Sequence, residues 1–357
     1  MTLIIAEAGV NHNGDEKLAF ELVEAAFQAG ADCIKFQTFN AQNLVTAGAK
    51  MADYQVANTR QQESQLSMLS RLELSPEAHH ALANYCQYLG IEFLSSAFDI
   101  QSLHFLSGEL GLKRLKLSSG ELTNAPLVLA YARTGCDILV STGMASLAEV
   151  EAALGVLAFG YTASPEESPG LAAFEQAWRS VAGQQALKRK VTLLHCTTDY
   201  PAPLDEINLR AMDTLSAAFD LPVGYSDHSA GIVIPVAAAA RGARIIEKHV
   251  TLDKNLPGPD HKASLTPDEL GDMVNAIRQV DRALGSKIKA ATASEIKNKD
   301  IVRKSVVATQ VINPGDAFTA GNISTKRPGG GMSPYMFWEL LQQTATQYYQ
   351  PGDLINE

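Results

Sequence analysis

The sequence predicts a closed (β/α)8 barrel of the TIM type, followed by a small β-rich domain. The first observation is a repeat: between Ile4 and His249, a short apolar strand followed by a helical segment recurs eight times. The second is length, because eight βα units usually fill about 250 residues. The third is a change of composition after Leu284, where helical segments give way to short β-rich pieces.

Polar side chains stand at the end of every expected strand. Because the carboxyl ends of barrel strands converge on one face, where active sites form, we expect these groups to meet. Core packing alone would not put carboxylates, ammoniums and imidazoles at the same end of so many buried strands. The strand ends are Ile4–Glu7, Cys33–Gln37, Phe93–Ser96, Leu115–Ser119, Ile138–Thr142, Leu193–Thr198, Val223–His228 and Ile245–His249.

Capping residues and helical periodicity predict the helices between the strands. Two connections are long: residues 40–73 follow the second strand, and residues 160–189 follow the fifth helix. Long loops in compact folds are usually lids or binding loops. The first is expected on the active face, whereas the second is expected on the opposite face with a structural role. The clearest helices are Asp15–Ala29, Ser75–Leu89, Ser146–Ala158 and Thr266–Leu284.

The chain is expected to divide into a barrel, a linker and a small domain. The barrel covers residues 1–284, and the polar, Lys-rich segment 285–299 is typical of a linker. Residues 300–357 form the small domain, and its size is marginal for a free-standing fold. We therefore expect it to pack on its own barrel or on a partner chain. Its expected strands are Ser305–Thr309, Asn322–Arg327 and Leu354–Ile355.

Composition excludes several classes of protein. The net charge of −10 argues against binding of nucleic acid or of an acidic membrane surface. The four cysteines form no C-x-x-C pair, which argues against a zinc cluster and for reduced thiols in the cytoplasm. The first residues lack the basic start of a signal peptide. No apolar run approaches the ~20 residues of a membrane span.

Two histidines end consecutive strands and are candidates for a metal site. The imidazoles of His228 and His249 are expected to approach one divalent ion. The alternative is a satisfied, partly buried side chain, which is the usual state of a lone histidine but a weaker explanation for a pair. His195 also ends a strand, but a thiol and hydroxyls flank it. The carboxylates near the pair, which favour a hard ion, are Asp227, Glu247, Asp253 and Asp260.

Two lysines lie within apolar strands. Lys35 and Lys116 each need an anionic partner or a strongly shifted pKa if they are buried. With the hydroxyls around them they suit a small phosphorylated or carboxylated substrate. The alternative is a Schiff base, as in lysine aldolases of this fold. The hydroxyls are those of Ser95, Ser96, Ser119, Ser141, Thr142 and Ser226.

Three loop segments complete the candidate site. Residues 251–262 hold two stiffening prolines, and their Asp260 is placed to reach a substrate hydroxyl. The string Asn11–Gly14 follows Glu7 on the same face, but Asn13-Gly14 is also an ordinary turn signature. Lys326-Arg327 precedes a glycine run and makes a basic tip on the small domain, or a plain solvated turn.

Several strings, in order along nearly the whole chain, resemble the sialic acid synthase family, the phosphoenolpyruvate-dependent nonulosonate synthases. The resemblance implies a barrel followed by a small antifreeze-like (SAF) domain. It also implies a domain-swapped homodimer in which each small domain covers the partner's active site. The strings are Ile5–Gly14, Lys35–Phe39, Tyr225–Ser229, Glu247–His249, Pro257–His261 and Lys326–Gly329.

The same resemblance implies condensation of phosphoenolpyruvate with an N-acetylated hexosamine and water, releasing phosphate. It makes His228 and His249 the ligands of a divalent metal, Mn²⁺ by preference, with Mg²⁺ or Co²⁺ as alternatives. The positions that match phosphoenolpyruvate contacts are Lys35, Ser96, Lys116, Ser119, Ser141 and Ser226. Those that match sugar contacts are Glu7, Gln37, Tyr200, Asp260 and Arg327, of which Glu7 and Asp260 are candidates for proton transfer.

The resemblance leaves the sugar open between N-acetylmannosamine and 2,4-diacetamido-2,4,6-trideoxymannose. Ser96 stands where a threonine is common, which keeps the hydroxyl. Thr198-Asp199 precedes Tyr200 where sialic acid enzymes often carry an asparagine, and the string His195–Pro203 is as similar to the legionaminic acid branch. Two other functions remain as alternatives: the lysine Schiff-base aldolase, and a non-catalytic sugar-binding or ice-binding protein suggested by the small terminal domain.

Overall fold

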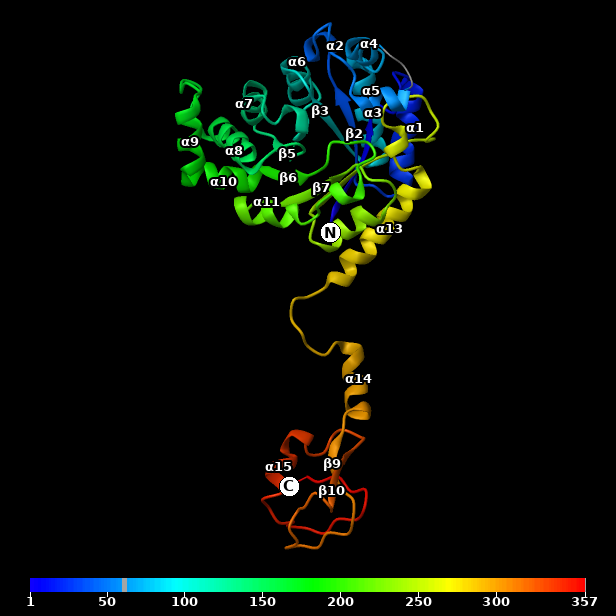
Figure 1. The fold of residues 1–357 in the computed structure, drawn as a ribbon, viewed down its shortest axis with the longest axis vertical. Helices are drawn as coiled ribbons and strands as arrows, with labels where there is room; N and C mark the ends of the chain where they lie inside the picture. Colours follow the sequence, from blue (N-terminus) through cyan, green and yellow to red (C-terminus); the bar gives the residue numbers. More distant parts are fainter. Residues whose placement is uncertain (60–62, 357) are drawn as a thin grey trace. The chain divides into compact units, whose positions relative to one another are not determined.

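The computed structural model of the chain describes residues 1–59 and 63–356 and contains two compact units, Met1–Gly285 and Ser286–Glu357. The first unit is a closed barrel of eight parallel strands, each paired with the next and the last with the first (Figure 1). The predicted fold class is therefore confirmed. The strands are β1 (Leu3–Gly9), β2 (Cys33–Thr38), β3 (Glu92–Ala97), β4 (Arg114–Leu117), β5 (Asp137–Ser141), β6 (Val191–His195), β7 (Val223–Asp227) and β8 (Ile245–His249).

Two apolar layers hold the barrel together. Alternate residues of a strand point to opposite faces, so each strand contributes both to the interior and to the layer under the helices. A larger apolar cluster joins the outer faces of the strands to the surrounding helices. The interior layer, below the strand ends, consists of Ile5, Cys33, Leu94, Leu139, Leu194 and Ile245.

The predicted helix starts are the observed N-caps. The side chains of Asp15, Ser75, Ser146 and Thr266 each accept a hydrogen bond from the first turn of the helix that follows. The helices that alternate with the strands are α1 (Glu16–Gln28), α5 (Pro76–Leu89), α6 (Ile100–His104, continued by a π-helical turn over Phe105–Glu109), α7 (Ala125–Arg133), α8 (Leu147–Thr162), α11 (Ala211–Phe219), α12 (Val233–Ala240) and α13 (Pro267–Leu284).

Helix α8 extends beyond its expected end at Ala158. Gly160 is typical of a helix stop, but here it allows close packing instead. A Cβ at Gly160 would lie 2.5 Å from the Cβ of Ala132 on α7. The glycine therefore marks the contact between two helices rather than the end of one.

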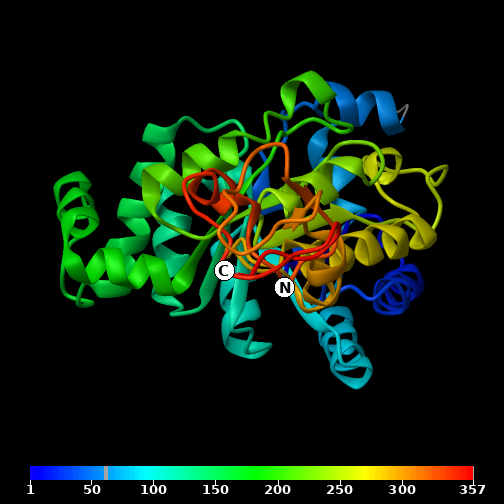
Figure 2. The same cartoon turned by 90° about the horizontal axis from the view of Figure 1, so that it is seen from below.

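Both long connections contain helices. Residues 40–73 hold α2 (Ala41–Leu44), α3 (Asp53–Thr59) and α4 (Gln65–Ser70), which we call the lid segment. Residues 160–189 hold the end of α8, α9 (Leu171–Arg179) and most of α10 (Val181–Lys190). Helix α9 lies at the periphery of the barrel unit in both views (Figures 1 and 2). The lid segment packs on the barrel through its own cluster of Val10, Phe39, Met51, Met68 and Leu72.

The second unit has a small apolar core of its own. Strand β9 (Ser305–Ala308) pairs antiparallel with β10 (Ile323–Lys326), and Leu354 bridges to Val307. The unit also holds α15 (Phe337–Leu340), and the segment expected as a linker, 285–299, runs into helix α14 (Ala293–Val302). The core residues are Val306, Ala308, Ile312, Phe318, Ile323, Leu340, Ala345, Tyr349 and Ile355.

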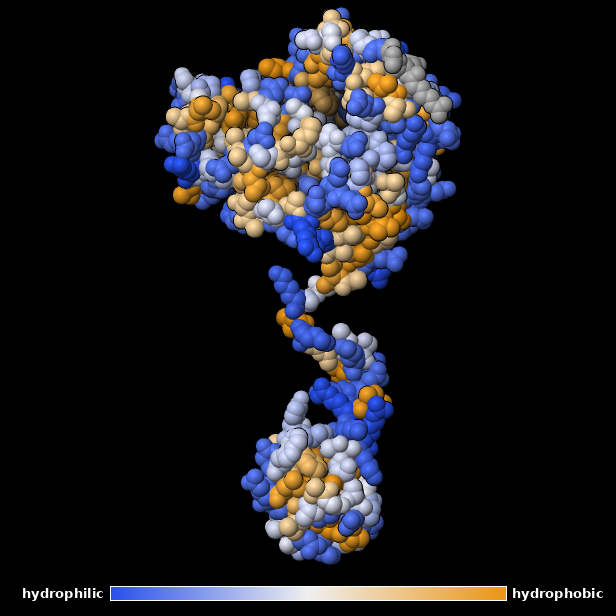
Figure 3. All heavy atoms as spheres, viewed as in Figure 1, coloured by the Kyte–Doolittle hydropathy of each residue, from blue (hydrophilic) through white to orange (hydrophobic). Residues whose placement is uncertain are grey.

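The surface mixes hydrophilic and hydrophobic residues, and apolar ones gather near α13 (Figure 3). None of the helices in the described ranges is long and apolar enough to cross a bilayer. The cysteines Cys33, Cys86, Cys136 and Cys196 are buried free thiols.

The turn after β1 buries a neutral histidine. His12 is fully buried, and its Nδ1 accepts a hydrogen bond from the backbone N–H of Gly14 at 3.0 Å. Burial lowers the pKa of His12 from 6.5 to about 4. The side chain of Asn11 donates to the carbonyl of Val250 and to Ser264. The string 11–14 is thus a turn tied to the loop after β8, although Asn11 Oδ1 and His12 Nε2 are buried without a hydrogen-bond partner among the described residues.

We expect His12→Asn to weaken the acid sensitivity of the fold. Because the pKa of His12 is depressed in the folded state, its neutral form contributes stability that is complete above pH 6.5 and is lost as the pH falls towards about 4. An asparagine Oδ1 keeps the acceptor for Gly14 and does not titrate. The measurement is the thermal unfolding midpoint across this range, with exposed His80→Asn as control. A pH profile of His12→Asn parallel to that of the unaltered protein would contradict the assignment.

Candidate active site

A polar cavity of about 330 Å³ opens at the carboxyl ends of the barrel strands. Its walls come from strand ends, from the loops that follow them and from the lid segment. The structure brings to this one cavity the site residues expected from the barrel sequence, namely Glu7, Lys35, Gln37, Ser96, Lys116, Ser119, Ser141, Tyr200, Ser226, His228, His249 and Asp260.

Two lysines and two carboxylates form an ion cluster at the floor of the cavity. Lys35 Nζ lies 2.7 Å from Glu7 Oε2 and 3.8 Å from Glu247 Oε2. Lys116 Nζ lies 3.0 Å from Glu247 Oε1, which also accepts a hydrogen bond from Ser226 at 2.8 Å. All four charged side chains are at most 5% exposed. The lysines therefore find the anionic partners that their burial demands.

The two carboxylates of the cluster differ in proton affinity. Burial raises the pKa of Glu7 to about 7, although the charge of Lys35 opposes the shift. Burial also favours the neutral form of Glu247, but the charges of Lys116 and Lys35 outweigh it and hold this pKa at about 2. Burial raises the pKa of Asp260 to about 7 as well. Glu7 and Asp260 can thus each gain or lose a proton near neutral pH, whereas Glu247 remains an anion.

The ion cluster also favours the protonated form of Lys35. Burial disfavours the charged form of Lys35, but the charges of Glu247 and Glu7 overcome it and raise its pKa. A Schiff base requires a neutral amine, which is produced by a lowered pKa. This electrostatic environment therefore favours anion binding over imine chemistry.

Hydroxyl groups surround the cluster. Lys35 Nζ donates to Ser96 Oγ at 3.3 Å, and Ser119 Oγ accepts from the backbone N–H of Gly143 at 3.0 Å. A Cβ at Gly143 would lie 2.8 Å from that same oxygen. Only glycine therefore allows the loop after β5 to come this close to Ser119. The Oγ of Ser141 is buried and has no hydrogen-bond partner among residues 1–59 and 63–356. These groups are available to a bound oxyanion.

The histidine pair lies beside the cluster. The ring centroids of His228 and His249 are 5.5 Å apart. His228 Nδ1 lies 2.6 Å from the carbonyl of Thr197 and donates to it, so Nε2 carries the free lone pair. Burial lowers the pKa of His228 to about 4 and that of His249 well below its usual range. Both rings are therefore neutral, as metal ligands must be.

The pair fits two ligands of a metal ion. His249 Nδ1 is buried and has no hydrogen-bond partner in the part of the chain that the structure describes, and Asp260 Oδ2 lies 4.0 Å away. In residues 1–59 and 63–356, no group of three or more His, Cys, Asp or Glu side chains is placed to hold a metal ion. A metal held by the pair would thus take its remaining ligands from substrate or water.

Aromatic stacking closes the site above the histidines. The ring of Tyr200 lies 4.1 Å from that of His228, and Tyr54 of the lid segment stacks on Tyr200 with centroids 4.9 Å apart. Asn58 donates to the carbonyl of Pro259 at 2.7 Å and to that of Tyr200. The lid segment and the loop after β8 therefore meet over the histidine pair, which agrees with their expected place on the active face.

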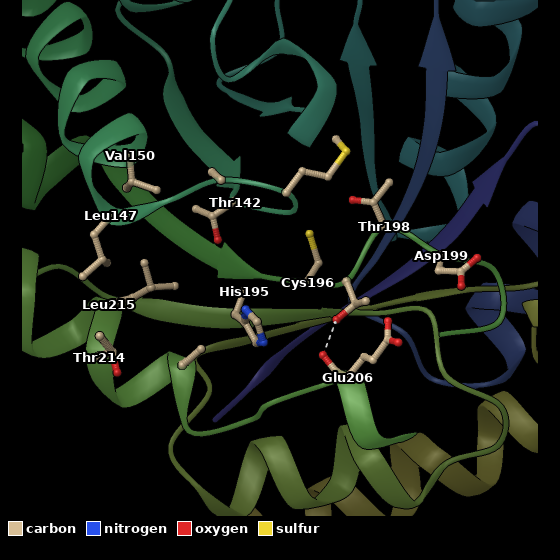
Figure 4. Close-up of a pocket in the computed structure, with 14 residues that line it drawn as sticks. Thr142, Leu147, Val150, His195, Cys196, Thr198, Asp199, Glu206, Thr214 and Leu215 are labelled. Carbon is tan, nitrogen blue, oxygen red and sulfur yellow. Dashed lines mark hydrogen bonds between the residues drawn. The ribbon is translucent and has the colours of Figure 1, made fainter. Parts of the chain in front are cut away.

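His195 lies outside this cavity. Its Nε2 lies 2.7 Å from the carbonyl of Ile207, and its side chain lines a neighbouring pocket of about 610 Å³ (Figure 4). Cys196 and Thr198 line both pockets, and Cys196 Sγ is 3.1 Å from Ser119 Oγ. His195 is therefore a hydrogen-bonded side chain outside the candidate metal site. The thiol and hydroxyls beside it in the sequence favoured this alternative.

The sequence did not point to several residues of the cavity wall, and it understated the importance of one residue that it did point to. Glu247 was recognised only as a carboxylate near a metal pair, yet it is the central anion of the ion cluster. Tyr54 and Gln55 line the cavity from the lid segment, and only the length of that segment signalled them. Arg327 belongs to the second unit, where its side chain is exposed.

Fold and cavity together define an enzyme built on a (β/α)8 barrel. Residues 22–289 match the NeuB family, and the chain belongs to that family. It is 48% identical to N,N'-diacetyllegionaminic acid synthase of Campylobacter jejuni, covering 100% of this chain and 99% of that protein. It is 43% identical to the protein of the same name from Legionella pneumophila, over 93% and 86% of the two chains.

A solved structure supports the same assignment. The N-acetylneuraminic acid (sialic acid) synthetase from Leptospira borgpetersenii, crystallised with citrate, superposes with a TM-score of 0.66 at 32% identity. The match covers 83% of this chain and 90% of that one.

Proposed function

We propose that this chain is a nonulosonate synthase that condenses phosphoenolpyruvate with an N-acetylated hexosamine and water and releases phosphate. The observation that carries the proposal is the ion cluster: two ammonium groups, ringed by hydroxyls, face a cavity beside a neutral histidine pair. A substrate with both a phosphate and a carboxylate suits such a site. Membership of the NeuB family and the names of the relatives support the same reaction.

For the sugar we propose 2,4-diacetamido-2,4,6-trideoxymannose, which leads to the legionaminic acid branch. Both relatives above are named N,N'-diacetyllegionaminic acid synthases. One side of the cavity is apolar, lined by Val10, Leu44, Met68, Leu69 and Leu72. A sugar with a C6 methyl group and a second acetyl methyl buries more apolar surface against such a wall than N-acetylmannosamine does.

The residues of the cavity divide the chemistry between two sides. Lys35 and Lys116, with Ser96, Ser119, Ser141 and Ser226, would hold the phosphate and carboxylate of phosphoenolpyruvate. C3 of the enolpyruvate then attacks the aldehyde carbon, water adds to the cationic C2, and the tetrahedral intermediate expels phosphate. Glu7 and Asp260, each with a pKa raised to about 7, suit the proton transfers to the aldehyde oxygen and from the water.

We propose that His228 and His249 hold a divalent metal, Mn²⁺ by preference, with Mg²⁺ or Co²⁺ as alternatives. When bound, such an ion supplies a Lewis acid for the aldehyde oxygen. The chain itself keeps both imidazoles neutral by burial and places Asp260 near His249. Gln37 and Tyr200 line the cavity on the sugar side.

We also propose that the second unit is an antifreeze-like (SAF) domain, and that the chain forms a domain-swapped homodimer in which Arg327 reaches the partner's sugar site. Support comes from the resemblance of Lys326–Gly329 and from the exposed guanidinium of Arg327. The unpaired thiols support a cytoplasmic location.

An assay of phosphate release tests the function. Phosphoenolpyruvate is offered with either sugar, with and without Mn²⁺ after chelator treatment. We expect release with both components only, faster with the diacetamido sugar and dependent on metal. Borohydride with pyruvate should trap no lysine; a trapped lysine and no phosphate release would instead indicate the aldolase.

The lysines of the ion cluster should contribute to the binding of phosphoenolpyruvate much more than to that of the sugar. Lys35→Ala and Lys116→Ala should each raise the KM for phosphoenolpyruvate by roughly 10- to 150-fold, since a hydrogen bond to a charged group contributes about 1.5–3 kcal/mol. The KM for the sugar should change far less. Steady-state kinetics measure both constants, and Lys190→Ala, which removes a lysine paired with Asp137 away from the cavity, is the control. An effect confined to the sugar would reassign these lysines.

A further inference from the structure

A second ion pair lies directly behind the histidine pair and takes no part in lining the cavity. Lys248 Nζ is 2.6 Å from Asp227 Oδ2, and both side chains are 0% exposed. Each residue sits next to a histidine in the chain, Asp227 before His228 and Lys248 before His249.

Strand geometry puts this pair on the outer face of the barrel. Because side chains alternate along a strand, His249 points inwards while Lys248 points to the layer under the helices. The same alternation on β7 separates His228 from Asp227. The two strands are in register at this point, with Asp227 opposite Lys248. The pair therefore joins β7 to β8 at the level where both histidines leave the strands.

Hydrogen bonds extend the pair into a closed network. Asp227 accepts from the backbone N–H of Ser229 and from its hydroxyl, each at 3.0 Å. Lys248 Nζ also donates to the carbonyl of Ser229. The backbone on either side of His228 is thus held, and its ring can keep the 2.6 Å hydrogen bond to the carbonyl of Thr197.

We propose that the buried Lys248–Asp227 pair positions the two histidines for metal binding, acting through the backbone of β7 and β8. This inference rests on the proposed metal site. A fully buried ion pair is poor evidence for stability, because the cost of removing two charges from water is comparable to their attraction. Its use here is geometric: without it, the turn at 227–229 and the end of β8 lose the contacts that fix the two rings.

The test measures Mn²⁺ affinity in the substrate-free full-length protein by calorimetry and electron paramagnetic resonance. The main variant is Lys248→Met/Asp227→Asn, which leaves no uncompensated buried charge and keeps an acceptor for Ser229. We expect its dissociation constant for Mn²⁺ to rise about 10- to 100-fold, as for other groups that orient metal ligands. In metal-free protein, the imidazole proton of His228 should exchange with solvent faster.

The matched control is an ion pair at the opposite end of the barrel. Arg278 donates to both carboxylate oxygens of Asp32 at 2.7 Å and to the carbonyl of Thr2. Arg278→Met should lower the unfolding temperature and leave the Mn²⁺ affinity unchanged. Unchanged affinity in the double variant, or an equal loss in Arg278→Met, would overturn the positioning role alone. Absence of Mn²⁺ binding in the unaltered protein would overturn the metal proposal and this inference together.

Discussion

His228→Ala and His249→Ala should each reduce turnover at least about 100-fold while the barrel remains folded. A metal acting as a Lewis acid lowers a barrier by several kcal/mol, and each 1.4 kcal/mol is tenfold in rate. The pair offers only two imidazoles, so removal of either leaves a single protein ligand. Both rings lie in the cavity wall rather than in the apolar core, and the strands beneath them keep their pairing.

The measurements are phosphate release at saturating Mn²⁺ and calorimetric Mn²⁺ affinity. His195→Ala is the matched control, because His195 ends the neighbouring strand but bonds to the carbonyl of Ile207 outside the cavity. The control should bind Mn²⁺ and turn over as the unaltered protein does. Full activity of His249→Ala after chelator treatment would remove the pair from the metal proposal.

The fold was predictable because its signal repeats along the chain. Every strand is buried on both faces, so each reads as a short apolar run, and helix starts were marked by capping side chains such as Ser75 and Thr266. Ends of helices were less predictable, as Gly160 shows, because a glycine that relieves a close contact and one that ends a helix look alike in sequence.

The site was predictable to the extent that residues stand at strand ends. Glu247 also stands at a strand end, but its importance depends on its contacts with Lys35 and Lys116. These lysines come from strands far away in the sequence, so the local sequence around Glu247 does not predict the contacts. Tyr54 belongs to a short helix of the lid segment, and its stacking on Tyr200 is a tertiary contact without a sequence signature. The expectation for Asp227 was wrong: the sequence placed it among the carboxylates near the metal pair, but its side chain lies outside the cavity lining and pairs with Lys248, because side chains alternate along the strand.

The largest effect expected of the second unit concerns Arg327. Arg327→Ala should be nearly inactive towards the sugar if the guanidinium completes the sugar site, because truncating one partner of a buried, hydrogen-bonded charge contact costs about 2–5 kcal/mol. Its KM for phosphoenolpyruvate should change little. Removal of residues 286–357 should likewise leave a barrel that binds Mn²⁺ but turns over poorly, since the barrel has its own apolar core.

Mixing two inactive variants decides whether Arg327 acts on its own barrel or on a partner's. In a heterodimer of Arg327→Ala with His249→Ala, a small domain that acts in trans gives one of the two sites both an intact histidine pair and an intact arginine. Activity should then return to at most about half, because two-fold symmetry supplies one complete site per dimer. If each small domain serves its own barrel, every site lacks one group and the mixture stays inactive. Subunit exchange after mild dissociation is confirmed by mass, and exchange without recovered activity would rule out the swapped arrangement.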